Sequence, residues 1–234
     1  MIRRSADPAR RFAEPPMPKI VDRDVQREEV LLATWRRIAR HGAAGVTIRG
    51  IAEEAGVSTG FITHYFRDKD EVLAAALQLC NERVSERVAA RGQGLAGMAA
   101  LRALIDAVLP LDEERFLTWQ IWLSFWGRSG VGEPLRREQR RGRESWRGAL
   151  HRVLGEAHRA GEIRPDLDPS YEAERLIVLV GGIGLQSQMQ RPRSFRRRAW
   201  SYVEAHLDGL MGPAPRSGAA LPADSDTTVT GGSP

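Results

Sequence analysis

The stretch AGVSTGFITHYFRDKDE, residues 55–71, decides how the N-terminal part of the chain folds. Gly56 can adopt the left-handed backbone conformation that ends a helix, and Ser58 is a strong N-cap for the helix that follows. That helix is expected to run only to about Tyr65, because Asp68 is the N-cap of yet another helix. The stretch therefore predicts a very short helix between two capped neighbours.

Apolar residues at helical spacing extend this pattern on both sides. An upstream helix is expected to start near Asp22 or Asp24, and the next helix to open at Thr47. Asp68 is followed three residues later by Glu71, which is the arrangement of a capping box. The apolar faces are expected to carry Leu31, Trp35 and Ile38 in the first helix and Ile48, Ile51, Ala52 and Ala55 in the second. Three short helices therefore precede a long one.

The remainder of the chain also has helical spacing, and no segment alternates polar and apolar residues as a strand would. Further helices are expected at residues 97–109, 113–127, 133–160, 171–190 and 195–210. Residues 1–17 are rich in Arg, Ala and Pro, and residues 212–234 are of low complexity, so both ends are expected to be disordered. The predicted fold is all-α, with a small N-terminal helical domain (residues 18–68) and a larger C-terminal helical domain (residues 69–211).

Composition excludes several classes of protein. Hydrophobic residues make up 42% of the 234, which is ordinary for a chain that buries a core. The net charge of +5 suits a polyanionic partner only weakly, because Lys19 and Lys69 are the only lysines and an arginine bias also follows from a GC-rich genome. The single cysteine, Cys80, excludes an internal disulfide and a Cys-rich zinc site. The longest apolar run, 176–185, is shorter than the roughly 18 residues of a membrane span, and the N-terminus lacks a secretion signal, so a cytoplasmic protein is expected.

A helix, a turn containing glycine and a second helix form the helix-turn-helix unit, whose second helix lies in the major groove of DNA. In the short helix, Ile62 and Phe66 fall on the side that can pack against the preceding helix. The opposite side is polar and small, and it carries Thr59, Gly60, Thr63 and His64. Such a face suits DNA, because glycine allows close backbone approach and threonine offers a hydroxyl and a methyl group to a base edge. A helical packing unit that binds no DNA is the alternative, and the pattern alone does not decide between them.

The segment TIRGIAEEAGVSTGFITHYFRDKDEVLAAAL, residues 47–77, resembles the DNA-binding domain of TetR-family transcriptional regulators. Within it, STGFITHYFRDK is especially similar to the betaine-inhibitor (BetI) subgroup. The resemblance implies that the following residues face DNA: Thr47, Arg49, Thr59, Gly60, Phe61, Thr63, His64, Tyr65 and Lys69. Many family members have tyrosine where this chain has Thr63, so the chain departs from the family pattern at one operator contact.

The resemblance extends over the C-terminal half, where it implies a domain that binds a small-molecule effector and forms a homodimer. Two helices from each subunit, at 171–190 and 195–210, would build a four-helix interface. The protein is then expected to be a repressor that binds a palindromic operator in double-stranded DNA and responds to its effector. The subgroup resemblance points to choline or glycine betaine genes, and a regulator of an unrelated efflux or metabolic regulon is the alternative.

Aromatic residues are concentrated in the predicted helix at 113–127. A hypothetical ligand cage consists of Trp119, Trp122, Phe125 and Trp126, with Trp146 expected opposite them. Aromatic faces attract quaternary ammonium ions, so such a cage is chemically suited to choline. Aromatic residues at helical spacing more often build a core, and that interpretation is favoured.

No catalytic or metal site is expected. His151 and His158 share a helix face, but no third metal ligand accompanies them, and the sequence lacks a Gly-rich phosphate loop or a nucleophile motif. The Arg-rich segment 133–160 includes Glu138 and Glu144, so a solvated helix is favoured over a second nucleic-acid patch. A helical protein–protein adaptor is the remaining alternative, and neither a cofactor nor a membrane partner is expected.

Overall fold

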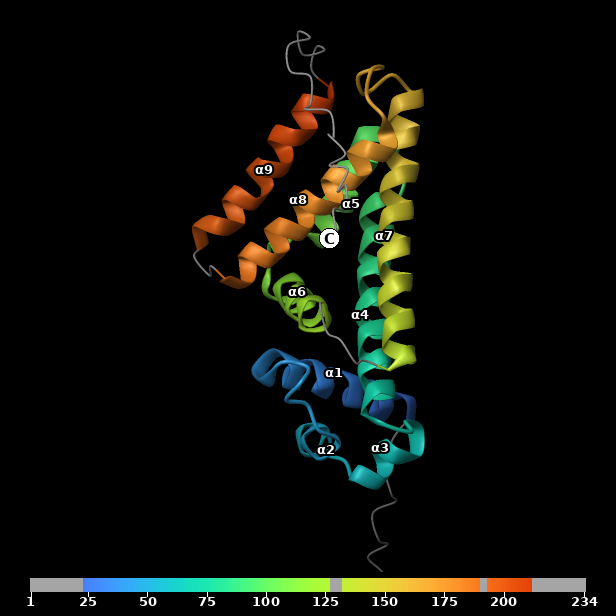
Figure 1. Ribbon diagram of the computed structural model, residues 1–234, viewed down its shortest axis with the longest axis vertical. Coiled ribbons are helices and arrows are strands. Elements are labelled where there is room, and N and C mark those ends of the chain that lie inside the picture. The colour runs from blue at the N-terminus through green and yellow to red at the C-terminus, as the bar shows by residue number, and fades with distance from the viewer. Residues whose placement is uncertain (1–22, 127–131, 190–192, 212–234) are drawn as a thin grey trace, which may run out of the picture. The chain divides into compact units, whose positions relative to one another are not determined.

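Figure 1 shows the computed structural model, which describes residues 23–126, 132–189 and 193–211. These residues form nine α-helices and no strand, which confirms the all-α prediction. The helices are α1 (Arg23–His41), α2 (Ile48–Ala55), α3 (Thr59–Tyr65), α4 (Lys69–Gly92), α5 (Gly97–Val108), α6 (Glu113–Phe125), α7 (Glu133–Arg159), α8 (Pro169–Met189) and α9 (Arg193–Met211). No helix within these ranges has the length and the apolar content needed to cross a membrane.

Three expectations concern residues beyond the described ranges. The arm at 1–17, the tail at 212–234 and the helix start at Asp22 all lie outside them. The first described helix begins at Arg23, one residue before the other expected start, Asp24.

The chain divides into two compact units. The first unit comprises the described residues up to Asn81 together with 120–139, and the second unit comprises 82–119 together with the described residues from Arg140 onward. The first unit therefore contains α1, α2 and α3, and the second contains α5, α8 and α9. Helices α4, α6 and α7 each contribute one part to each unit.

The core of the first unit forms where the apolar faces of its short helices meet. Trp35 and Ile38 of α1 are buried, as are Ile51 of α2 and Ile62 of α3, which confirms these predicted core positions. The Trp35 indole N–H donates a hydrogen bond of 2.8 Å to the carbonyl oxygen of Ala76. Helix α1 is thereby fixed to α4 by apolar burial and by a satisfied buried donor.

The ends of the short helices are set by local hydrogen bonds. The Thr47 hydroxyl accepts from the Gly50 N–H at 3.0 Å, and Gly56 ends α2 with a φ of +66°. Ser58 caps α3 by accepting from the Phe61 N–H at 3.1 Å. These residues are the caps that the sequence predicts, so both helices begin and end where expected.

The start of α4 differs in one detail from the predicted capping box. Asp68 accepts from the Glu71 N–H at 2.9 Å, as expected. The Glu71 carboxylate, however, accepts from the backbone N–H of Arg67 at 2.7 Å and also contacts its guanidinium. These hydrogen bonds, led by the one from the backbone, lower the pKa of Glu71. The reciprocal half of the box therefore reaches Arg67, the residue before the cap, with which Glu71 also forms an ion pair.

In the second unit, a tryptophan of α6 packs closely against a glycine of α8. Trp119 is 3% exposed, and its indole N–H donates to the carbonyl oxygen of Val108 at 2.8 Å. Its ring lies directly against Gly184 of α8. Of two glycines in α8, Gly184 is packed against this ring, whereas Gly182 has open space beside it. Helices α8 and α9 lie side by side in Figure 1.

Candidate nucleic-acid interface

Helix α3 has one buried side and one exposed side. Ile62 is fully buried, and Phe66, which follows the helix, is 4% exposed. The side chains on the other side are exposed, and they are the predicted residues Thr59, Gly60, Thr63 and His64. The predicted division of the helix is therefore confirmed, and a small polar surface remains open to a partner.

Contacts within the chain do not require glycine at position 60. Among the described residues, a Cβ atom there would meet only the Ser58 hydroxyl oxygen, at the ordinary contact distance of 3.7 Å. The backbone φ of Gly60 is not positive, so its conformation does not demand glycine either. The absence of a side chain at Gly60 leaves room for a partner to approach the backbone closely.

Polar and aromatic groups on α3 are held in defined positions. The Thr63 hydroxyl donates to the carbonyl oxygen of Gly60 at 3.3 Å, which leaves the oxygen of this exposed side chain able to accept a hydrogen bond. Phe61 and Tyr65 form a ring pair with centroids 5.0 Å apart, and His64 packs edge-on against Tyr65 at 5.0 Å. Phe61 and Tyr65 are partly buried, so they support this surface more than they extend from it.

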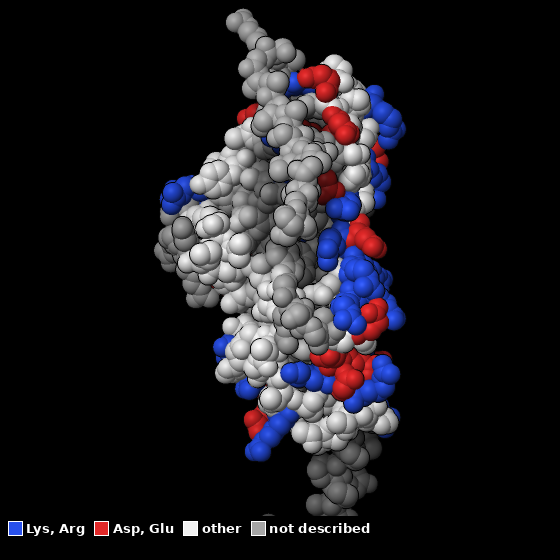
Figure 2. Space-filling model, viewed as in Figure 1, with Lys and Arg blue, Asp and Glu red and all other residues white. Residues whose placement is uncertain are grey.

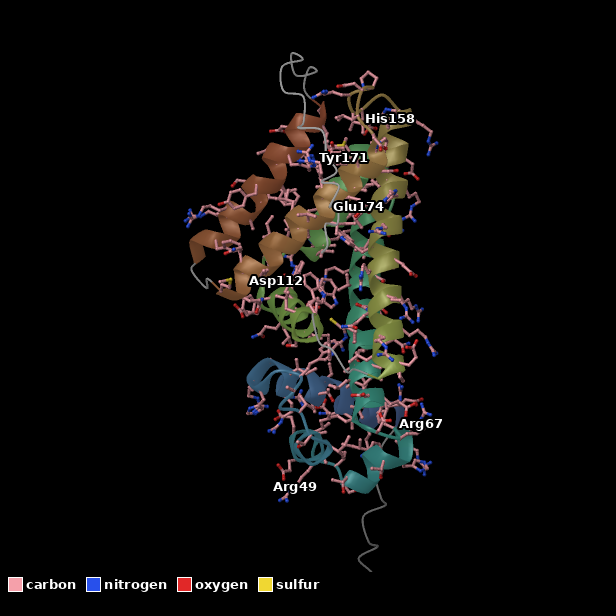
Figure 3. The ribbon with its side chains drawn as sticks, in the orientation of Figure 1. Arg49, Arg67, Asp112, His158, Tyr171 and Glu174 are labelled. Atoms are coloured by element: carbon pink, nitrogen blue, oxygen red, sulfur yellow. The ribbon has the colours of Figure 1, made fainter. Side chains whose placement is uncertain are left out.

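Cationic residues surround α3. Arg49 of α2 is 86% exposed and pairs with Glu53 at 2.9 Å, and Arg67 follows α3 and pairs with Glu71. Figure 3 shows both arginines in the part of the first unit that carries α2 and α3. Arg67 is not among the predicted DNA-facing residues. Its position in the turn directly after α3 is a sequence signal by which it could have been chosen as a candidate. Lys69, the first residue of α4, is partly buried and makes no ion pair with any described residue.

The five residues of the hypothetical ligand cage have different environments. Trp119 and Phe125 are buried, Trp122 donates to the Asn81 side-chain oxygen at 3.0 Å, and Trp126 is 53% exposed beyond the end of α6. Trp119 and Trp146 belong to the second unit, whereas the other three belong to the first. The burial of Trp119 and Phe125 agrees with the favoured core interpretation.

Arginines of α7 are exposed and partly neutralised. Arg136 pairs with Glu133 at 3.2 Å, and Arg147 pairs with Glu174 of α8 at 2.8 Å. On the face of the molecule in Figure 2, basic and acidic side chains are mixed along this helix. Among the residues that the structure describes, no three His, Cys, Asp or Glu side chains are grouped so that they could hold a metal ion.

Comparison with known proteins identifies the family. Residues 30–76 match the family described as bacterial regulatory proteins, tetR family, and residues 97–212 match the family described as BetI-type transcriptional repressor, C-terminal. The HTH-type transcriptional regulator PksA of Bacillus subtilis (strain 168) is 31% identical over 196 residues, which cover 83% of this chain and 94% of PksA. The chain belongs to the TetR family of bacterial transcriptional regulators.

Other relatives of this TetR-family protein agree. The HTH-type transcriptional regulator BetI of Stenotrophomonas maltophilia (strain R551-3) is 29% identical over 198 residues, which cover 82% of this chain and 97% of BetI. A crystal structure of a transcriptional regulator from Saccharomonospora viridis in complex with choline has a TM-score of 0.69 at 26% identity, with 77% of this chain and 96% of that chain covered. The predicted resemblance to the BetI subgroup is confirmed, and the family is one of DNA-binding regulators rather than enzymes.

Proposed function

We propose that this TetR-family protein is a cytoplasmic, ligand-responsive repressor that binds a palindromic operator as a homodimer. The observation that carries the proposal is α3, whose buried side fixes it in the first unit while its exposed side presents small polar groups. A helix of this kind fits the major groove, where Thr63 and His64 can reach base edges. Thr47, Arg49 and Lys69 then contact phosphates on either side and set the position of α3.

DNA binding and effector binding belong to different parts of the chain. Residues 18–68 bind DNA, and residues 69–211 bind the effector and form the dimer. Effector binding shifts the distance between the two recognition helices and so weakens their simultaneous fit to two half-sites.

An exposed apolar face on α8 supports the dimer. Tyr171, Val178 and Leu185 follow one another at seven-residue intervals and are 58%, 74% and 47% exposed. Gly182 lies on the same helix with open space beside it, and Tyr202 of α9 is 50% exposed. Soluble monomers rarely leave such a face uncovered, whereas a second copy of α8 and α9 would bury it in a four-helix interface.

For the effector, we propose a small quaternary ammonium compound of the choline class. The BetI-type match over residues 97–212 and the choline complex of the S. viridis regulator support this class. Of the hypothetical cage residues, Trp122 and Trp126 keep part of their aromatic surface exposed and would meet the cation. A regulator of an unrelated efflux or metabolic regulon is the second candidate, because an identity near 30% to PksA and BetI leaves the regulon open.

The proposal is tested with purified full-length protein and fragments of bacterial DNA. Retained fragments are sequenced, and one retained duplex is titrated with protein in the absence and presence of choline, with a scrambled duplex as the control. We expect tight sequence-dependent binding that choline weakens. Sequence-dependent binding that ignores choline would favour the unrelated regulon, and a dimer that retains no duplex would favour a protein–protein adaptor.

A further inference from the structure

Arg37 of α1 carries a charge that no described residue balances. The two other arginines nearby on α1 are paired, since Arg36 and Arg40 both contact Glu54 of α2 and Arg36 also contacts Glu29. Arg37 forms no ion pair or hydrogen bond with any residue in the described ranges. Its Nε atom is buried and has no hydrogen-bond partner.

The Arg37 guanidinium occupies the space that a side chain at Gly50 would fill. A Cβ atom on Gly50 would lie 2.6 Å from Nη2, 2.9 Å from Cζ and 3.1 Å from Nε of Arg37. Gly50 is buried and lies one helical turn before Glu54, the partner of the paired arginines. The guanidinium of Arg37 therefore lies beside the first turn of α2, the turn that also carries Arg49.

This arrangement is unfavourable for the isolated chain in two ways. A buried donor without a partner destabilises a protein. Glycine inside a helix is less favourable than alanine, and the φ of Gly50 is not positive, so its backbone does not require glycine. The Nε atom itself is buried, but the Arg37 side chain as a whole is partly exposed, so its charge can be met by an anion outside the described residues.

We propose that Arg37 is a further DNA-binding residue, whose guanidinium is seated on Gly50 and pairs with an operator phosphate next to Arg49. The inference rests on the proposed DNA-binding function and adds a residue to it. A phosphate is the anion expected beside the first turn of α2, and the planar guanidinium matches phosphate oxygens with two parallel hydrogen bonds. The contact positions the protein on the duplex and carries no base information.

The first test measures the affinity of the full-length protein for its operator over a series of salt concentrations. Arg37→Gln should reduce the slope of log K against log salt by about 0.9 for each phosphate that the variant no longer neutralises, or about 2 for a dimer. It should weaken binding to the operator and to a scrambled duplex alike. Arg36→Gln is the matched control, because this neighbouring arginine is already neutralised by Glu29 and Glu54, and its slope should stay near that of the wild type.

A second variant separates DNA contact from a packing role. Gly50→Ala keeps the charge of Arg37 but displaces its guanidinium, so it should reduce the salt slope as Arg37→Gln does, while the melting temperature stays the same or rises because alanine favours the helix. The double variant should show the same slope as either single variant. If Arg37→Gln shows the salt slope of the wild type, the proposed phosphate contact is wrong. If only Gly50→Ala shows the wild-type salt slope, the contact does not depend on the position of the guanidinium beside Gly50. A wild-type protein that binds no duplex would instead overturn the proposed function.

Discussion

Gly184 provides the sharpest test of the packing in the second unit. An alanine Cβ at this position would lie well inside 3.0 Å of the Trp119 ring, a distance that real Cβ atoms essentially never reach. The Trp119 ring must then move, although it is 3% exposed and its indole N–H is bonded to the Val108 carbonyl. Overpacking of a core destabilises by about 1–3 kcal/mol, and a buried N–H that loses its partner adds about 1–3 kcal/mol.

The gain in helix propensity from alanine offsets only about 1 kcal/mol of this loss. We therefore expect Gly184→Ala to lower the free energy of unfolding by about 3 kcal/mol, which corresponds to about 6–12 °C in melting temperature. Urea and thermal unfolding followed by tryptophan fluorescence measure the change. Gly148→Ala is the matched control, because Gly148 is exposed on α7 and no described residue outside the local helix backbone comes within 4 Å of its Cβ position, so this variant should be as stable as the wild type or more so. Equal stability of the two variants would refute the packing described for Trp119.

Three further predictions concern the DNA contact, the dimer and the pH dependence. Lys69→Ala should weaken binding to the operator and to a scrambled duplex alike, because a phosphate contact does not distinguish between bases. Filter binding measures both affinities, and a loss confined to the operator would contradict this prediction. Gly182→Glu should place an unpaired charge in the proposed interface and give monomers, and unchanged dimers in sedimentation would count against that interface. Burial lowers the pKa of His206 below its ordinary 6.5; the charge of Arg175 reinforces this shift and that of Glu172 opposes it. The unfolded chain therefore binds the proton more readily than the folded protein does. Stability should accordingly fall as the pH drops below about 6.5. Urea unfolding at about pH 7.5 and about pH 5.5 measures the loss, which His206→Gln should reduce.

Local hydrogen bonds explain why the short helices could be predicted from sequence. Thr47, Ser58 and Asp68 each cap through a residue three positions later, and Gly56 ends α2 through its own backbone conformation. Such signals lie within a few consecutive residues, so their meaning does not depend on the tertiary fold. The division of α3 into a buried and an exposed side follows equally from helical periodicity.

Contacts between residues far apart in sequence could not be predicted in the same way. Nothing near Gly50 indicates that the Arg37 guanidinium fills its side-chain position, and nothing near Gly184 indicates the ring of Trp119. Spacing also fails for the aromatic residues, since Trp119 and Trp126 are seven residues apart yet one is buried and the other is exposed beyond the end of α6. These features depend on which helices pack together, which a single periodic pattern does not contain.

The central claim is that the exposed side of α3 reads DNA bases, and Thr63→Ala tests it most directly. Wild-type and variant protein are each allowed to select from a library of operators with randomised positions, and the retained sequences are compared. We predict that the variant loses about 1–3 kcal/mol of discrimination at one position in each half-site, with the other positions unchanged. Equal loss of affinity for every sequence, with all base preferences intact, would contradict the claim.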